Sequence, residues 1–175
     1  TKEMAEQPKF FFIEIFNPGH IHGQKIKSLG IKGERALWQE TLATANETLT
    51  KTLDVIQKND PDALIVIMAD HGGFVGMEYT QQAYTKTQDR DLIYSMFSST
   101  LSIHWPQGNI PAFDINFKSA VNVFRILVSY LSEDTSYLEY LQDDSSYVIL
   151  NEDAPGGVYK YIDTDGTIVF EALPE

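Results

Sequence analysis

The apolar run from Ala63 to Ala69 constrains the fold of this chain more than any other segment. It contains no polar residue and is followed at once by Asp70-His71-Gly72-Gly73. A short run that is apolar at every position is typical of a strand covered on both faces, as in the centre of a parallel sheet. An amphipathic helix is predicted before it, from Glu34 to Lys58, and Asn59-Asp60-Pro61 ends that helix.

Further strands and a second helix are predicted on either side of this run. Pro8 to Phe16 is rich in aromatic and β-branched residues and stops at Asn17-Pro18-Gly19, which indicates a strand. The order strand, helix, strand then favours a βαβ unit with a parallel pair. Ser98 to Trp105 partly alternates and predicts another strand. Ser119 to Leu131 predicts a helix with Ser119 as its N-cap.

The end of the chain predicts a β-hairpin over residues 158–170, because two alternating segments flank Asp165-Gly166. With 175 residues the chain is long enough for one domain with a real core. We therefore expect a single α/β domain over residues 1–175. It has a polar leader at 1–8, a mostly parallel central sheet flanked by helices, and this hairpin.

The charge and the absence of cysteine exclude several classes of function. The formal net charge is -12, which argues against binding to nucleic acid or to anionic lipid, since both need basic patches. The chain has no Cys, so thiol catalysis, disulfides and Cys-ligated zinc are excluded. A small anionic substrate is not excluded, because its binding depends on the charge near the site and on a bound metal, and not on the net charge of the chain.

Asp70 and His71 are the candidate metal ligands. In an open α/β sheet, ligands bind in the crevice outside the carboxyl ends of the strands, and this pair follows the strand expected to be central. A carboxylate and an imidazole are good ligands for Zn²⁺ or Mn²⁺. Gly72-Gly73 would permit a sharp bend and close approach of a ligand. The competing interpretation is a polar turn that closes the strand.

Five segments in order along the chain resemble motifs of the alkaline phosphatase superfamily. Within it, the similarity is greatest to bacterial sulfatase-like proteins and phosphoglycerol (lipoteichoic-acid-type) transferases. The segments span about residues 9 to 149. They read KFFFIEIFNPGH (9–20), WQETLATAN (38–46), IVIMADHGG (65–73), SAVNVFRILVSYL (119–131, with Ala120 where the family usually has Pro) and DDSSYVI (143–149).

The resemblance implies a fragment of an alkaline-phosphatase-like sandwich with a metal site. Asp70 and His71 would hold a divalent metal (Zn, Mn, Ca or Mg), weakly, because two protein ligands rarely suffice where a closed site wants about four. His20, or failing that His22, would contact the substrate or a metal. The usual Pro-His-x-Pro reads Pro18-Gly19-His20-Ile21, with the His displaced by one. Arg90 could reach a substrate anion, or it is a solvated loop charge.

The resemblance also implies that part of the enzyme lies outside this chain. The family's Ser, Thr or formylglycine nucleophile precedes a strand like Phe10 to Phe16, and only a polar leader stands there. We expect the carboxyl-terminal part of a sulfatase-like catalytic domain, inert without its amino-terminal half. That half would be its partner. The substrate would be a small anionic ester or a glycerophospholipid-like molecule. The location would be periplasmic or cell-surface, with a membrane-anchored parent.

Two alternatives to this function stay open. The chain could be a degenerate or truncated domain without catalysis, serving binding or assembly, or it could belong to a phosphomutase-like member. Sulfate and phosphate esters are both tetrahedral anions, and the residues that discriminate between them are expected mostly upstream. The sequence therefore predicts a metal-dependent hydrolase or transferase of one of these two ester classes without choosing between them.

Overall fold

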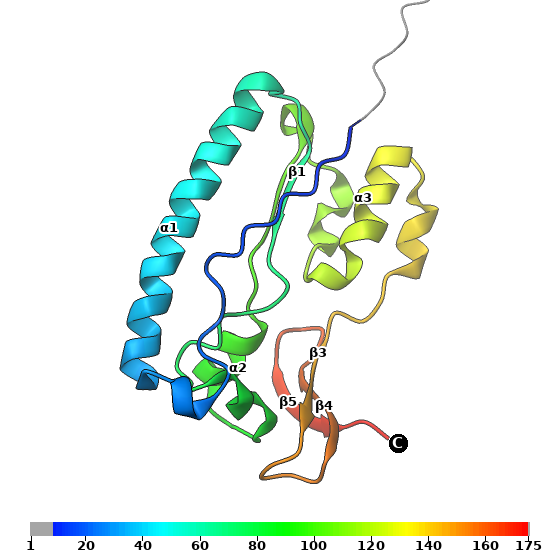
Figure 1. The fold of residues 1–175 in the computed structure, drawn as a ribbon. Helices are drawn as coiled ribbons and strands as arrows, with labels where there is room; N and C mark the ends of the chain where they lie inside the picture. Colours follow the sequence, from blue (N-terminus) through cyan, green and yellow to red (C-terminus); the bar gives the residue numbers. More distant parts are fainter. Residues whose placement is uncertain (1–8, 175) are drawn as a thin grey trace, which may run out of the picture.

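The computed structural model describes residues 9–174 and builds them from helices and two small separate sheets (Figure 1). The α-helices are α1 (Gly30–Asn59), α2 (Arg90–Phe97) and α3 (Val123–Ser132). The strands are β1 (Ile65–Met68), β2 (Leu101–His104), β3 (Ser146–Leu150), β4 (Gly157–Ile162) and β5 (Ile168–Ala172). Short 3-10 turns connect them: Lys25–Lys27, Thr80–Tyr84, Pro106–Gly108, Ala112–Asn116, Ala120–Asn122 and Thr135–Tyr140.

The predicted parallel central sheet is wrong. β1 pairs only with β2, antiparallel, with Ile65 opposite His104 and Met68 opposite Leu101. The other sheet is an antiparallel meander in the order β3-β4-β5. The βαβ unit and the alkaline-phosphatase-like sandwich are therefore absent from the described residues. An apolar run predicts burial but carries no information on strand direction, and β1 itself is only half-buried.

The segment from Lys9 to Phe16 is extended but belongs to no sheet. Figure 1 draws it in blue without an arrow, and none of its residues makes a hydrogen bond within the described chain. Its large side chains face solvent: Phe10, Phe12 and Phe16 are each at least 80% exposed. The strand predicted here, whose Pro8 lies outside the described residues, is thus an isolated extended chain with both faces uncovered.

Several local predictions agree with the structure. Residues 34–58 lie within α1, which begins four residues earlier at Gly30, and its predicted apolar face holds Ala45, buried. The hydroxyl of Ser119 accepts a hydrogen bond from Val121 N–H (3.2 Å) and caps the turn that leads into α3. The hairpin at 158–170 forms from β4 and β5, with Gly166 at a φ of 82°.

Helix α2 and strand β3 were not predicted, and both contribute to the main core. The core lies between α2, residues 74–84 and the three-stranded sheet, and Tyr161 and Ile93 at its centre are fully buried. Ile21 belongs to the same cluster although it lies in the loop after residue 16. The core therefore anchors the loop that carries His20 and His22.

Asn122 is a buried polar link between α3 and the segment leading into β3. Its Oδ1 accepts a hydrogen bond from Gln142 N–H (2.9 Å). Its Nδ2 donates to the Gln142 carbonyl (2.9 Å) and to Asp144 Oδ2 (3.1 Å). Replacing Asn122 would remove a hydrogen bond from the Gln142 N–H, the Gln142 carbonyl and the Asp144 carboxylate. This residue should therefore contribute measurably to stability.

We expect Asn122→Ala to lower the free energy of unfolding by about 1–3 kcal/mol, since it leaves backbone groups of Gln142 without partners. Urea denaturation followed by circular dichroism measures the change. Asn46→Ala on the exposed face of α1 is the matched control and should be neutral or slightly stabilising, because Ala favours helix. Equal effects of the two substitutions would contradict the structural role of Asn122.

Candidate functional site

The loop that carries His20 and His22 packs against the turn that follows β1. Ile21 N–H donates to the Gly73 carbonyl (3.3 Å), and Thr80 N–H donates to the His22 carbonyl (2.9 Å). These bonds bring the His20 ring over the His71 ring, stacked with the ring centroids 5.9 Å apart. His20 thus lies beside His71 for a different reason than the sequence suggested: loop-to-loop hydrogen bonds replace the neighbouring parallel strands.

Asp70 and His71 place two potential ligand atoms close together. Asp70 Oδ2 lies 3.4 Å from His71 Nε2, and the two side chains are 87% and 43% exposed. His71 Nδ1 lies 2.8 Å from the Gly72 carbonyl, which can only accept, so Nδ1 carries the proton. In the neutral ring, Nε2 then has a lone pair facing the carboxylate. Two electron-rich atoms at this distance favour a cation, or a proton, between them.

All three histidines in this region share the same hydrogen-bonding pattern. His20 Nδ1 lies 3.0 Å from the Ile21 carbonyl, and His22 Nδ1 lies 2.8 Å from Glu34 Oε1. Each Nδ1 therefore faces an acceptor and donates its proton to it. The Nε2 atom of each neutral ring is left as the free acceptor, which is the arrangement expected of metal-binding histidines.

Phe74 holds the rings of His20 and His71 in place. Its ring meets both edge-on, with centroid distances of 6.1 Å to His20 and 5.4 Å to His71. Its backbone has a φ of 59°, in the left-handed region that a bulky residue rarely adopts. Strained backbone of this kind concentrates at functional sites. The strain at Phe74 therefore favours a functional role for this turn.

Glu34 and Trp38 complete the surroundings of the loop, and sequence reasoning missed Glu34. Glu34 is buried and accepts hydrogen bonds from His22 N–H (3.0 Å) and Leu29 N–H (2.8 Å), besides the His22 ring. Burial alone would raise the pKa of Glu34, but these hydrogen bonds outweigh it and hold the pKa below its ordinary value of 4.5. Glu34 is therefore ionised at neutral pH.

A hollow of about 400 Å³ opens between this loop and α1. Trp38 Nε1 donates to the Gly19 carbonyl (3.0 Å) and fixes the loop across it. His20, His22, Glu34 and Trp38 are among its lining residues. Glu34 and Trp38 are four residues apart and so lie on one face of the helix that follows the histidine loop. This spacing was the sequence signal for the wall of the hollow.

Gly72 and Gly73 are required by the close approach of the chain to itself. A Cβ on Gly72 would lie 2.1 Å from the Ser95 carbonyl oxygen, and one on Gly73 would lie 2.3 Å from Trp38 Nε1. Gly72 N–H also donates to the Met96 carbonyl (2.8 Å). The sequence predicted that these glycines make room for a ligand. The groups that lie against them are instead parts of α1 and α2.

Arg90 lies apart from the histidines. It is the first residue of α2, its guanidinium lies 4.7 Å from the Tyr94 ring centroid, and it is 3.8 Å from the Asp91 carboxylate. No hydrogen bond or ion pair in residues 9–174 joins it to His20, His22, Asp70 or His71. These contacts match the solvated alternative and do not bring Arg90 to the candidate site.

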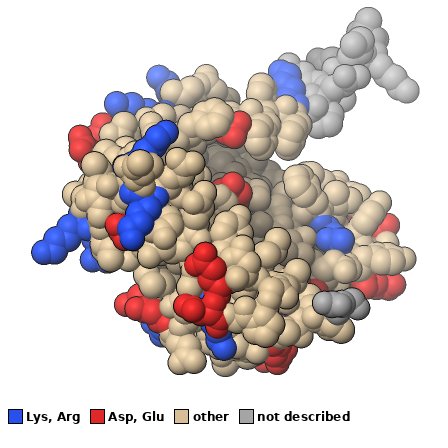
Figure 2. Space-filling model, turned by 60° about the horizontal axis from the view of Figure 1, so that its bottom comes forward, with Lys and Arg blue, Asp and Glu red and all other residues tan. Residues whose placement is uncertain are grey.

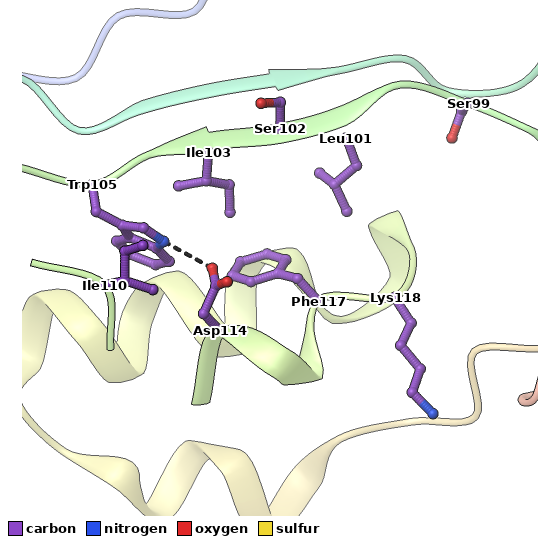
Figure 3. A pocket seen from close by; sticks show the side chains of 9 residues that line it. All are labelled: Ser99, Leu101, Ser102, Ile103, Trp105, Ile110, Asp114, Phe117 and Lys118. Carbon is purple, nitrogen blue, oxygen red and sulfur yellow. Dashed lines mark hydrogen bonds between the residues drawn. The ribbon is translucent and has the colours of Figure 1, made fainter. Parts of the chain in front are cut away.

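A second hollow, also of about 400 Å³, lies between β2 and the turn Ala112–Asn116 (Figure 3). Trp105 Nε1 donates to Asp114 Oδ1 (2.8 Å) at its wall, and Lys118 stands at its other end. No histidine lines it. Since it shares no residue with the first hollow, it is not part of the site that the histidines define.

The donors at Asp70 and His71 fit a divalent cation only in part. One carboxylate and one imidazole suit Zn²⁺ or Mn²⁺, but a closed site needs about four ligands. Within residues 9–174 no three His, Asp or Glu side chains gather closely enough to hold a metal. The described chain therefore supplies two ligands at most at this point, and any others would come from water, substrate or another part of the protein.

Comparison with known proteins finds no relative of this chain. The chain matches no protein-family model, no curated protein and no solved structure. No helix of the described part combines the length and the apolar character needed to cross a membrane.

We expect Gly72→Ala to lower the free energy of unfolding by about 1–3 kcal/mol, because the new methyl group would overlap backbone atoms of α2 that cannot rotate away. Chemical denaturation measures the loss. Gly156→Ala is the control: its Cβ would find nothing nearer than 4.0 Å, and it should stay within about 0.5 kcal/mol of the parent sequence. Similar stabilities of the two variants would refute the close packing at Gly72.

Proposed function

We propose that this chain is part of a metal-dependent hydrolase or transferase that acts on phosphate or sulfate esters. Asp70 and His71 are its metal ligands and His20 its substrate contact. The nucleophile comes from a part of the protein outside this chain. The observation that carries the proposal is the convergence of Asp70 Oδ2 and His71 Nε2 at 3.4 Å, with the His20 ring stacked 5.9 Å from His71.

Each residue has a defined task in this proposal. The metal, when bound, polarises the ester and neutralises charge that develops on its oxygens. The Gly72 carbonyl holds the His71 ring through Nδ1 and so directs Nε2 toward the Asp70 carboxylate. The Ile21 carbonyl orients the His20 ring in the same way. In its protonated form His20 can donate from Nε2 to an anionic ester oxygen while Nδ1 stays on the carbonyl.

The proposed substrate is a small anionic ester or a glycerophospholipid-like molecule, and nucleic acid is not proposed. In Figure 2, basic side chains are interspersed with acidic ones and form no continuous basic area on the face in view. With a net charge of -12, attraction of an anion has to come from the local site and its metal. An extracytoplasmic location and a membrane-anchored parent stay predictions.

We further propose that an amino-terminal part of the same protein packs on residues 9–16. This segment exposes aromatic side chains on both faces and leaves its backbone donors and acceptors without partners in the described chain. Pairing with one strand of a second copy would cover an edge and leave both faces in water. A folded part of the protein that supplies a strand and a layer on each face satisfies more of these groups.

A non-catalytic binding or assembly domain is the second candidate. It is favoured by the finding that residues 9–174 bring no three His, Asp or Glu side chains together at a possible metal position. Two kinds of domain would show this geometry: a domain whose site has lost metal ligands, and a domain whose remaining ligands come from another part of the protein. Activity of the longer protein separates the two.

We expect the 175-residue chain to show near-background turnover of aryl phosphate and aryl sulfate with Mn²⁺ or Zn²⁺, because in this proposal the nucleophile comes from a part of the protein outside this chain. A longer protein that contains this chain should hydrolyse one of them. Asp70→Asn and His71→Gln should then lower kcat/KM by roughly 10²-fold or more, as for loss of a transition-state electrostatic contact. Steady-state kinetics with each metal provides the measurement.

His104→Gln is the matched control, because His104 is exposed at the end of β2 and lines neither hollow. Turnover by the isolated chain that Asp70→Asn abolishes would show that the nucleophile lies within it. A longer protein that stays inert with metal supplied would favour the non-catalytic domain.

Hydrogen exchange tests the packing on residues 9–16. In the isolated chain the amides from Phe10 to Phe16 should exchange close to the unprotected rate, since they have no hydrogen-bond acceptor. In the longer protein they should slow by roughly 10²-fold or more. The Ala45 amide in α1 is the internal control and should be protected in both. Protection that instead rises with the concentration of the isolated chain would identify a second copy as the occupant.

A further inference from the structure

Residues 25–35, at the start of α1, concentrate positive charge in an otherwise acidic chain. They include four of the 13 Lys and Arg residues: Lys25, Lys27, Lys32 and Arg35. All four side chains are exposed, and none forms an ion pair within residues 9–174. Glu34, the one acid of the segment, is buried and hydrogen-bonded to His22 and Leu29. The surface of residues 25–35 is therefore positive, and we call it the basic tip.

Three aliphatic side chains are exposed among these cations. Ile26 is 90% exposed, Leu29 is 60% exposed and Ile31 is 48% exposed. Figure 1 draws this segment in blue at the lower end of α1, at the periphery of the molecule. A single exposed aliphatic residue is ordinary on a protein surface. Three of them within a short segment, interspersed with lysines, form a small apolar patch with a charged rim, which is typical of an interaction surface.

Hydrogen bonds give the basic tip a defined shape. Ser28 Oγ donates to the Glu78 carbonyl and accepts from Gly30 N–H (2.9 Å). Leu29 N–H donates to Glu34 Oε1 (2.8 Å), which ties the turn Lys25–Lys27 to the first turns of α1. The exposed aliphatic side chains therefore project from a folded turn. A surface that is already ordered loses less conformational entropy when it binds.

We propose that the basic tip docks on an anionic phospholipid membrane. Its cations contact the lipid head groups, and Ile26 enters the boundary between head groups and acyl chains. Peripheral membrane binding combines apolar side chains that enter this boundary with basic side chains that are attracted by anionic lipid, and the basic tip has both. The net charge argued against anionic lipid because such a partner needs a basic patch, and residues 25–35 supply one locally. The proposal does not depend on the ester chemistry.

The net charge of -12 does not prevent this contact. At physiological ionic strength the Debye length is about 8 Å, so exposed charges farther than this from the head groups are largely screened. Attraction then depends on the cations at the point of contact, and the charge of the remaining surface contributes little. Binding should weaken as salt is added, because the contacts between cations and head groups are screened as well.

Two other anionic partners use the basic tip less completely. Proteins that bind single-stranded nucleic acid stack its bases on aromatic side chains, and residues 25–35 contain no aromatic residue. An acidic protein is disfavoured because Lys is depleted in protein–protein interfaces, which bury roughly 800 Å² per partner. A phosphate backbone or an acidic chain would also leave Ile26 in water. An anionic membrane uses the cations and the aliphatic side chains together.

Co-sedimentation of the 175-residue chain with vesicles tests the proposal. One set of vesicles is phosphatidylcholine alone, and the other is an equal mixture of phosphatidylcholine and phosphatidylglycerol. We expect the chain to bind the mixed vesicles and to stay in solution with the neutral ones. Lys25→Gln combined with Lys27→Gln should weaken binding to the mixed vesicles by roughly 10-fold or more.

Matched variants on the rest of α1 separate docking by the basic tip from a general effect of charge or polarity. Lys51→Gln combined with Lys58→Gln removes the same charge from exposed positions of α1 and should bind like the parent sequence. Ile26→Ser should weaken binding several-fold, whereas Val55→Ser, at a side chain that is 61% exposed, should not. All four variants should keep the fold, because the replaced side chains face solvent, and circular dichroism verifies this.

Three results would overturn the proposal: no binding to the mixed vesicles, equal losses in the two lysine variants, or equal losses in the two Ser variants. A DNA oligonucleotide or polyglutamate that binds as tightly as the mixed vesicles would also overturn it and would identify the partner class instead. The ester function is tested separately. Vesicle binding with an inactive longer protein would leave this inference standing, and an active longer protein without vesicle binding by the chain would leave only the ester function.

Discussion

The backbone from Gly72 to Phe74 is the contact on which the rest of the site depends. Within three residues it donates to α2 through Gly72 and Phe74, accepts from Ile21 of the histidine loop through Gly73, and packs under the Trp38 indole of α1. There is no room for a side chain at either glycine. Because the histidine loop, α1 and α2 all meet this short stretch of backbone, main-chain geometry places the loop histidines relative to His71.

The functional consequence is a row of imidazoles with a common orientation. Carbonyl or carboxylate acceptors hold the Nδ1 atoms of His20, His22 and His71, so their Nε2 atoms are the reactive ones. Buried, ionised Glu34 adds a fixed negative charge behind His22. This electrostatic arrangement favours cations at the ring nitrogens. An anionic ester would therefore be attracted by a bound metal or a protonated ring.

The elements that could be predicted are those specified by local patterns. The amphipathic period of α1, the Ser119 cap and the Asp165-Gly166 turn are short-range features, and the structure contains all three. Helix α2 was missed although Asp89 accepts from Asp91 and Leu92 N–H as an N-cap, because the polar residues around it suggested a loop. The direction of β1 against β2 was also missed, since strand pairing is a long-range choice.

For the candidate site, the sequence by itself determined which residue types were available: an Asp-His pair after an apolar strand, and a loop with two more histidines. Their chemistry as ligands follows from the side chains alone. Only the tertiary structure decided that His20 stacks on His71, that Arg90 does not join them, and that Glu34, 12 residues from His22, is its hydrogen-bond partner. The physical reason is that ring orientation and tautomer are set by acceptors that folding brings close, and local sequence patterns do not specify these contacts.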